Sequence, residues 1–181
     1  MVFAPLASGG MEWPMAAYSP RTGFWYSHAK YSPSNRGVTS TGTTPQAGTL
    51  LGVRHGVFGA LNTVTGKVAW TIPILTTLPT SGMTVAGDLV FFGDNTGLFY
   101  GTSAATGEIL WVFDAWTVPG GTGGNGGAAV YEVNGVEYVL YGFGGEPGQS
   151  FELGDAVVAF ALPSALAAAR EKTAAAKARV K

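Results

Sequence analysis

The sequence predicts an all-β fold, arranged as part of a β-propeller and followed by one short C-terminal helix. Short apolar and aromatic runs alternate with turns rich in Gly, Asn and Thr, as is typical of strands and hairpins. Thr-Gly pairs begin at residues 22, 65 and 106, at spacings of 43 and 41 residues, and Trp70 and Trp111 lie four positions after the second and third Gly. A period of about 40–50 residues with several short strands per repeat is typical of propeller blades.

The strands follow one another along residues 1–163. We expect them at residues 15–18, 24–28, 56–61, 68–72, 83–85, 89–92, 98–103, 109–113, 128–133, 136–141 and 156–162. Asn134-Gly135 is the strongest short hairpin signal. Residues 32–48 predict a long loop, and the Gly-rich residues 120–127 predict a flexible connection between blades.

This pattern amounts to about three to four blades, fewer than most closed propellers have. Blade-type repeats bury their faces only against neighbours, so we expect partner sequence to complete the ring. The abrupt apolar start suggests that Met1 is an internal start or the cut end of a longer protein. Residues 164–181 are rich in Ala, Lys and Arg and predict a basic terminal helix with Ser164 as its N-cap.

The composition excludes several classes of protein. Charged residues make up 12% of the chain, about half the average fraction, so small polar residues or another chain must cover its surface. A net charge of −1 argues against nucleic-acid binding. The absence of cysteine excludes disulfide scaffolds and Cys-based zinc sites. We do not expect membrane binding, because the chain has no long apolar run and its tail offers only alanine as an anchor.

Isolated polar residues give little sign of chemistry. His28 and His55 have no partner at ligand spacing, so we interpret both as structural. The segment 94–97 lacks the Asp-x-Asp spacing and downstream Glu of a calcium loop, and it predicts a hairpin turn.

Several segments, taken in order, resemble one enzyme family. Residues 60–70 resemble its tryptophan-docking repeat, which reads Ala-x-Asp-x-x-Thr-Gly-Lys-x-x-Trp, and residues 101–111 resemble a second copy. Residues 9–20 resemble its Gly-Gly-x-Asn-Trp segment and the turn after it. Residues 86–94, 131–145 and 157–163 resemble later segments. Over residues 7–163, the chain resembles the C-terminal third of the PQQ-dependent (quinoprotein) alcohol dehydrogenases.

The resemblance implies three to four blades of an eight-bladed quinoprotein-type propeller. It also implies PQQ on the central axis with Ca²⁺ or a lanthanide, and oxidation of a primary alcohol or similar substrate by hydride transfer to PQQ. A periplasmic location, a cytochrome c electron acceptor, and partner blades from a separate chain or a missing N-terminal part follow from it too. No segment matches the family's catalytic or metal-binding carboxylates, so we expect this chain alone to be inactive.

Three residues are cofactor-contact candidates through the same resemblance. Glu12 and Trp13 align with the Asn-Trp pair that contacts PQQ, and Phe143 replaces the Trp of a Gly-Trp-Gly-Gly turn. Glu12 substitutes a carboxylate, which only accepts hydrogen bonds when ionised, for a neutral amide, and Phe143 lacks the indole N–H. These departures keep an alternative open: a non-catalytic propeller segment that assembles with other chains and binds no PQQ.

Overall fold

A computed structural model describes residues 2–3, 10–11, 14–31, 34–35, 55–74, 81–124, 126–145 and 152–179. Its strands in the first half of the chain are β1 (Val2–Phe3), β2 (Ala17–Ser19), β3 (Phe24–Tyr31), β4 (Ser34–Asn35), β5 (His55–Asn62) and β6 (Val68–Ile74). The strands in the second half are β7 (Thr84–Ala86), β8 (Leu89–Gly93), β9 (Leu98–Ser103), β10 (Ile109–Asp114), β11 (Ala129–Val133), β12 (Val136–Phe143) and β13 (Ala156–Phe160). A 3₁₀ turn, η1, spans Ala115–Thr117, and α1 spans Pro163–Arg179.

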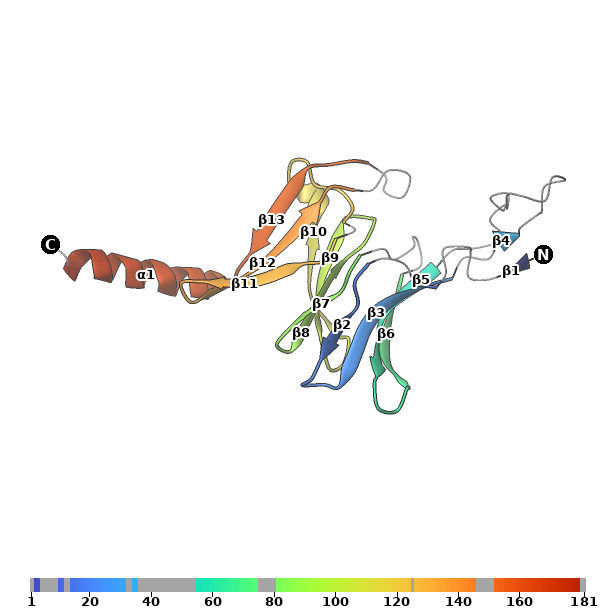
Figure 1. Ribbon diagram of the computed structural model, residues 1–181. Coiled ribbons are helices and arrows are strands. Elements are labelled where there is room, and N and C mark those ends of the chain that lie inside the picture. Colours follow the sequence, from blue (N-terminus) through green and yellow to red (C-terminus); the bar gives the residue numbers. More distant parts are fainter. Residues whose placement is uncertain are drawn as a thin grey trace.

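Apart from β1 and β4, which pair with each other, the described strands form three successive antiparallel sheets of the kind that build propeller blades. The first sheet has the order β2-β3-β5-β6, the second β7-β8-β9-β10, and the third β11-β12-β13. Figure 1 shows these sheets side by side, with α1 projecting away from them. The predicted fold class, an all-β partial propeller with a C-terminal helix, is therefore confirmed.

Each sheet has a short-turn end and a long-loop end, because its strands alternate in direction. The turns between first and second strands carry Gly23, Gly87 and Gly135, and those between third and fourth strands carry Gly66 and Gly107. All five glycines have positive φ, which glycine adopts without steric cost. The connections from one sheet to the next, and those between second and third strands, lie at the opposite end. Most of them are longer, but β8 and β9 are joined by a short turn, residues 94–97.

This topology corrects the predicted repeat. Thr65-Gly66 and Thr106-Gly107 occupy equivalent turns, but Thr22-Gly23 joins the first two strands of the same sheet that contains Thr65-Gly66. The 43-residue spacing therefore lies within one blade. The prediction of three equivalent Thr-Gly turns was wrong, because both hairpins of a blade need the same kind of glycine.

Two further predictions change in detail. Residues 34–35, inside the predicted loop 32–48, form β4 and pair with β1, whereas residues 36–48 lie outside the described part. Helix α1 begins at Pro163, one residue before the expected N-cap Ser164. Proline suits the first helical position because its φ is already helical and its missing N–H would have no partner there.

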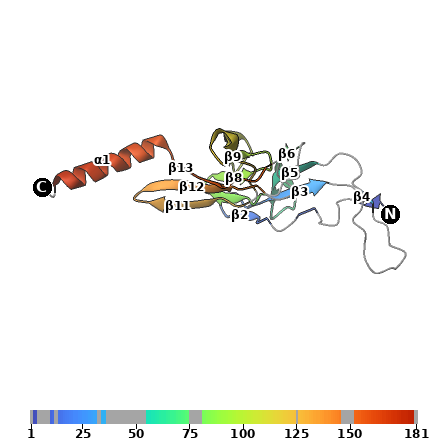
Figure 2. The same ribbon diagram turned by 90° about the horizontal axis from the view of Figure 1, so that it is seen from above.

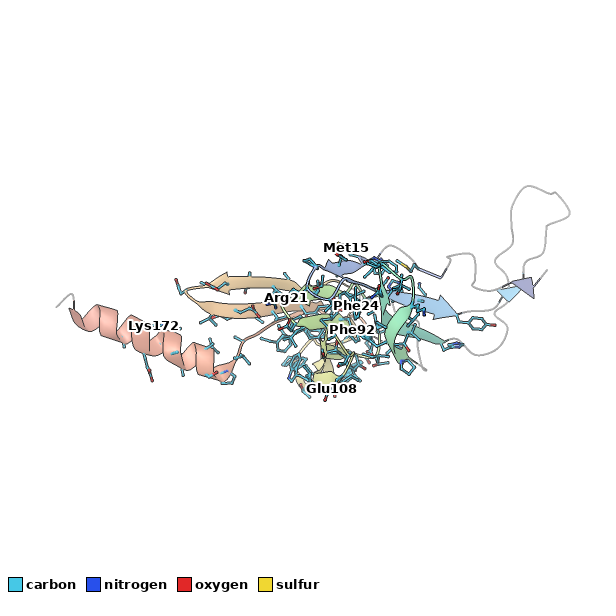
Figure 3. The ribbon with its side chains drawn as sticks, turned by 90° about the horizontal axis from the view of Figure 1, so that it is seen from below. Met15, Arg21, Phe24, Phe92, Glu108 and Lys172 are labelled. Carbon is cyan, nitrogen blue, oxygen red and sulfur yellow. The ribbon has the colours of Figure 1, made fainter. Side chains whose placement is uncertain are left out.

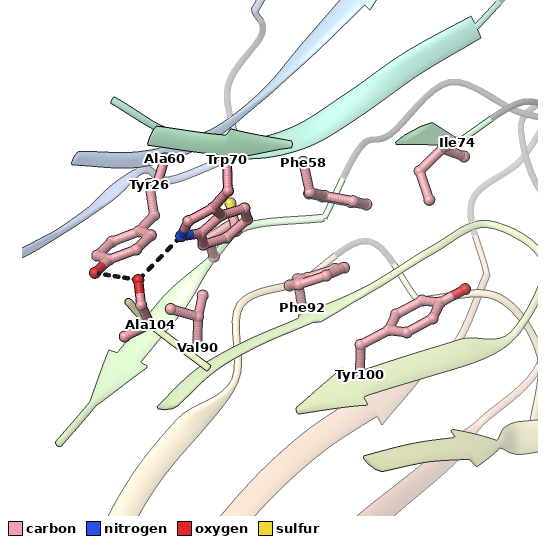
Figure 4. Close-up of a cluster of buried hydrophobic side chains, with 10 residues drawn as sticks. Tyr26, Phe58, Ala60, Trp70, Ile74, Val90, Phe92, Tyr100 and Ala104 are labelled. Carbon is pink, nitrogen blue, oxygen red and sulfur yellow. Dashed lines mark hydrogen bonds between the residues drawn. The ribbon is translucent and has the colours of Figure 1, made fainter. Parts of the chain in front are cut away.

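The first and second sheets are joined by a cluster of apolar side chains around Trp70 (Figure 4). The Trp70 indole N–H donates a hydrogen bond to the carbonyl oxygen of Ala104 at 3.0 Å, and the Tyr26 hydroxyl donates to the same oxygen at 3.1 Å. Ala104 begins the turn between β9 and β10, so Trp70 of one sheet docks onto the turn of the next. The rings of Phe58 and Phe92 pack against each other in the middle of this interface, tilted by 30° at a centroid distance of 4.2 Å. The structural role predicted for Trp70 is confirmed.

The second and third sheets are joined by a second aromatic cluster. Phe99 stacks on Tyr141 at 4.3 Å and meets Phe143 edge-on at 6.0 Å. Trp111 contacts Phe160 edge-on at 4.8 Å, yet 39% of its surface remains exposed, compared with 9% for Trp70. Trp111 therefore lies between two sheets as predicted, but in the described structure it is only partly covered.

Replacing Trp70 by Ala should lower the free energy of unfolding by about 3–5 kcal/mol, because a large buried side chain leaves a cavity. Trp70→Phe keeps an aromatic ring and loses the bond to Ala104, so it should cost less. Val64→Ala, at a side chain that is 90% exposed, should change stability by less than about 0.5 kcal/mol. Urea denaturation followed by circular dichroism measures all three. A Trp70→Ala loss below about 1 kcal/mol would contradict the docking role.

The equivalent turns at Gly66 and Gly107 offer a second test of the packing around Trp70. A Cβ added at Gly107 would lie 2.6 Å from the Trp70 ring, whereas one added at Gly66 would meet no described atom within 4 Å. Their φ angles, +73° and +67°, impose nearly the same backbone strain on alanine. Gly107→Ala should therefore destabilise the protein by about 1–3 kcal/mol more than Gly66→Ala. Equal losses of unfolding free energy in the two variants would show that the Trp70 ring does not press on this turn.

Candidate functional site

The long-loop end is where the sequence predicts the cofactor contacts, and its loops are tied together across all three sheets. Met83 N–H donates to the Met15 carbonyl oxygen at 3.0 Å, which joins the segments leading into β7 and β2. Gly82 N–H donates to the Gly126 carbonyl oxygen at 3.2 Å, and Gly145 N–H donates to that of Gly123 at 2.8 Å. The connected segments come before the first strands or follow β12, so they form one layer. Figure 3 shows Met15, which precedes β2, and Glu108, which precedes β10, on opposite sides of the core residue Phe92.

Ser81 is a junction within this layer. Its hydroxyl donates to the Gly126 carbonyl oxygen at 2.8 Å and accepts from the Gly93 N–H at 3.0 Å. The Tyr141 hydroxyl lies 2.9 Å from the same oxygen. Burial raises the pKa of Tyr141, and the nearby Asp94 charge raises it further. A neutral phenol therefore links the second sheet to the third at this end.

Asp94 organises the turn between β8 and β9. One carboxylate oxygen accepts hydrogen bonds from the Thr96 N–H at 2.9 Å, the Thr96 hydroxyl at 2.6 Å and the Leu98 N–H at 3.1 Å. The other accepts from the Tyr100 hydroxyl at 3.0 Å. Burial raises the pKa of Tyr100, and the charge of Asp94 adds to that effect. The carboxylate is buried and hydrogen-bonded through both oxygens, which confirms the predicted turn and gives Asp94 a structural role.

Residues 121–124 of the Gly-rich connection are closely packed, which the prediction of a flexible segment over residues 120–127 did not anticipate. Residues 121–124 are all buried. A Cβ added at Gly121, Gly123 or Gly124 would overlap atoms of other chain segments, namely those of Ala115, Asn95 and Tyr141 respectively. Glycine is required here by the close approach of these segments, which composition alone does not reveal.

The three candidate contact residues have different outcomes. Glu12 and Trp13 lie outside the described residues, so their predicted contacts stay predictions. Phe143 ends β12, is fully buried and packs on Phe113 and Tyr141. Its side chain presents no exposed surface, whereas the next residue, Gly144, is exposed at the same loop end. Contact between Phe143 and a cofactor likewise stays a prediction.

The polar side chains in the described part of the chain stabilise the fold, and they do not form a cluster of catalytic or metal-binding groups. No group of three or more His, Asp or Glu within it is arranged to hold a metal ion. His28 is buried in β3, and His55 stacks on Tyr31 at 4.8 Å at the start of β5. No helix in this part is long and apolar enough to cross a membrane. The links made by Ser81 and Tyr141 were not foreseen, since they join residues far apart in the sequence.

Comparison with known proteins gives the family. Residues 12–157 match the PQQ_2 family model, described as outer membrane protein assembly factor BamB. The putative dehydrogenase XoxF of Paracoccus denitrificans is 33% identical over 159 residues, which covers 80% of this chain and 25% of that protein. The lanthanide-dependent methanol dehydrogenase of Methylorubrum extorquens is 32% identical over 159 residues, again 80% of this chain and 25% of the other.

Solved structures agree on the fold. The quinohemoprotein alcohol dehydrogenase of Comamonas testosteroni superposes with a TM-score of 0.69 at 24% identity, over 89% of this chain and 27% of that one. A europium-containing methanol dehydrogenase superposes with a TM-score of 0.61 at 24% identity, over 80% and 26%. The chain belongs to the PQQ propeller family and is homologous to a segment of the PQQ-dependent alcohol and methanol dehydrogenases. It spans about a quarter of the length of these relatives.

Removing the Asp94 carboxylate should disrupt the long-loop end. Asp94→Ala leaves four donor groups without their acceptor, and unpaired buried donors cost about 1–3 kcal/mol each when water cannot reach them. We expect a loss of at least about 3 kcal/mol in unfolding free energy. Asp88→Ala, which removes only an exposed ion pair with Arg21, should cost less than about 1 kcal/mol. Equal losses in the two variants would contradict the role given to Asp94.

Proposed function

We propose that this chain forms three consecutive blades of a PQQ-dependent alcohol dehydrogenase whose remaining blades come from additional polypeptide. The completed propeller would oxidise a primary alcohol or similar substrate, with hydride transfer to PQQ supported by Ca²⁺ or a lanthanide. The observation that carries the proposal is similarity over 159 residues, at 32–33% identity, to dehydrogenase-type relatives of which this stretch covers 25%. A periplasmic location and a cytochrome c electron acceptor belong to the same proposal.

The described residues fit a supporting role in such a site. The long-loop layer supplies backbone groups and neutral hydroxyls, but the one buried carboxylate among the described residues, Asp94, is already engaged by internal hydrogen bonds. The donor set for a metal ion would therefore have to come from the remaining blades, since calcium takes about six to eight oxygen ligands. The long-loop layer of this chain would hold the loops around the cofactor in place. Glu12 and Trp13 would be its residues nearest to the cofactor.

A second candidate is a non-catalytic propeller segment that assembles with other chains and binds no PQQ. The matching family model is described as an outer membrane protein assembly factor rather than a dehydrogenase. Glu12 in place of an amide and the buried Phe143 favour the same alternative.

A binding titration followed by an activity assay separates the candidates. The isolated chain, titrated with PQQ in the presence of Ca²⁺ or a lanthanide, should show neither micromolar binding nor dye-linked alcohol oxidation. Co-expression with the remaining three quarters of the Methylorubrum extorquens enzyme should restore PQQ binding, and Trp13→Ala should then weaken it at least about tenfold.

Two results would contradict the proposal. Turnover by the isolated chain would require a self-contained site. An assembled complex that binds no PQQ, even when Glu12→Asn and Phe143→Trp restore the family's residues, would favour the non-catalytic segment.

A further inference from the structure

Two hydrogen bonds hold the chain before β2 against β3. Strand β2 pairs with β3 only over residues 24–26, and β3 continues past the start of β2 (Figure 2). Along this continuation, the Lys30 N–H donates to the Gly10 carbonyl oxygen at 2.7 Å. The Ser27 hydroxyl donates to the Met11 sulfur at 3.3 Å. Gly10 and Met11 therefore attach to the part of β3 that β2 does not reach.

The three described methionines differ in exposure and in how they attach. The exposed fraction is 39% for Met11, 68% for Met15 and 3% for Met83. Met15 is joined to the second sheet through its backbone carbonyl, which accepts from the Met83 N–H, and Figure 3 shows its side chain at the surface. Among the described residues, Met11 is the only methionine whose sulfur accepts a hydrogen bond.

The chemistry of sulfur makes this attachment sensitive to oxidation. A thioether sulfur is a weak hydrogen-bond acceptor, and it is also the atom that oxidants convert to a sulfoxide. A sulfoxide sulfur carries partial positive charge, so it no longer accepts a bond from the Ser27 hydroxyl. That hydroxyl keeps a second acceptor, the His28 carbonyl oxygen at 3.3 Å. Losing the sulfur acceptor therefore leaves no buried hydroxyl unpaired, and the change stays local.

We propose that Met11 is a redox-sensitive attachment point, at which oxidation of the sulfur by hydrogen peroxide loosens residues 10–11 from β3. A sulfur lone pair attacks one peroxide oxygen, and an S–O bond forms as the O–O bond breaks. The proton of the attacked oxygen passes to the displaced hydroxide, which leaves as water. Sulfur loses two electrons and the peroxide gains them. Methionine sulfoxide reductases reverse the modification.

Met11 is a better site for such control than Met15, although Met15 is more exposed. Oxidation of the Met15 side chain leaves its backbone bond to Met83 unchanged, whereas oxidation of Met11 removes one of the two bonds to β3. The inference goes beyond the proposed function and needs no cofactor. Glu12 and Trp13 follow Met11 in the sequence, so in a completed propeller the oxidation state of Met11 would affect the proposed cofactor contacts.

Two backbone amides report on the two attachments separately. The Lys30 amide, bonded to Gly10, reports on the Met11 segment, and the Met83 amide, bonded to Met15, is the internal control. Hydrogen exchange of the full chain is measured by NMR before and after treatment with hydrogen peroxide. Lys30 should exchange at least about fivefold faster after oxidation, and Met83 should change by less than about twofold. A mixture of both methionine sulfoxide reductases should restore the original rate.

Leucine variants assign the effect to one sulfur. Met11→Leu keeps an apolar side chain that cannot be oxidised in this way, so peroxide should leave its Lys30 exchange unchanged. Met15→Leu is the matched control, because it removes the more exposed sulfur, and it should respond like the parent chain. Ser27→Ala removes the donor, so Lys30 should already exchange faster and peroxide should add less than about twofold. Circular dichroism verifies that the variants are folded.

Several outcomes would overturn the inference. One is unchanged Lys30 exchange in a parent chain whose Met11 is oxidised, as located by tandem mass spectrometry. Another is an equal response to peroxide in Met11→Leu, or a response that Met15→Leu abolishes. If Met11→Leu does not fold, a peroxide titration of the parent chain decides, since Lys30 exchange must rise with the sulfoxide fraction at Met11 and not with that at Met15. None of these readouts involves PQQ, so a failed PQQ titration leaves this inference standing.

Discussion

The carbonyl oxygen of Ala104 accepts hydrogen bonds from two aromatic side chains of the neighbouring sheet, and the packing of the first two sheets depends on this acceptor. Tyr26 and Trp70 approach it from the first sheet, while the turn that ends at Gly107 presents it from the second. A carbonyl oxygen has two lone pairs, so both donors are satisfied in a buried site. The same contact orients the indole ring, which buries most of its apolar surface between the sheets.

The second interface uses different chemistry toward the long-loop end. There, Ser81, Tyr141 and the Gly-rich connection form a network of backbone and hydroxyl groups, and closely approaching chain segments leave room only for glycine. Well-satisfied buried polar networks rigidify the elements that they join. A rigid loop layer is the property that a cofactor site at this end would need, because positioning is the protein's main contribution to cofactor chemistry.

The two interfaces between the three sheets therefore differ from the outer faces of the first and third sheets. At the interfaces, turns and aromatic side chains of neighbouring sheets cover one another. At the ends, a Cβ at Gly66 would meet no described neighbour, and β13 has a side that no described strand pairs with. The low charged fraction of the chain, 12%, agrees with surfaces that are covered by other blades instead of by water.

Local chemistry made much of the fold predictable. Turn glycines and alternating apolar runs predict the hairpins, and the position of Trp70 after its turn predicts a packing residue. Each of these signals spans only a few neighbouring residues, so it can be read from the sequence. The sequence did not distinguish the turn at Thr22-Gly23 from the other two, since both types of hairpin need a glycine with positive φ. The close packing of residues 121–124 and the links of Ser81 depend on contacts between distant segments, which no local pattern records. The proposed contacts of Glu12 and Trp13 rest on resemblance alone.

Hydrogen exchange at Gly66 and Gly107 tests the central claim most directly. The two amides make the same bond, to Asn62 at 2.9 Å and to Ser103 at 2.8 Å, in equivalent turns. They differ in that Trp70 covers the second turn. In the isolated chain, Gly107 should exchange at least about tenfold more slowly than Gly66, and adding the remaining blades should slow Gly66. Equal exchange rates in the isolated chain would contradict the claim that the Gly107 turn is covered by the neighbouring sheet while the Gly66 turn is left uncovered.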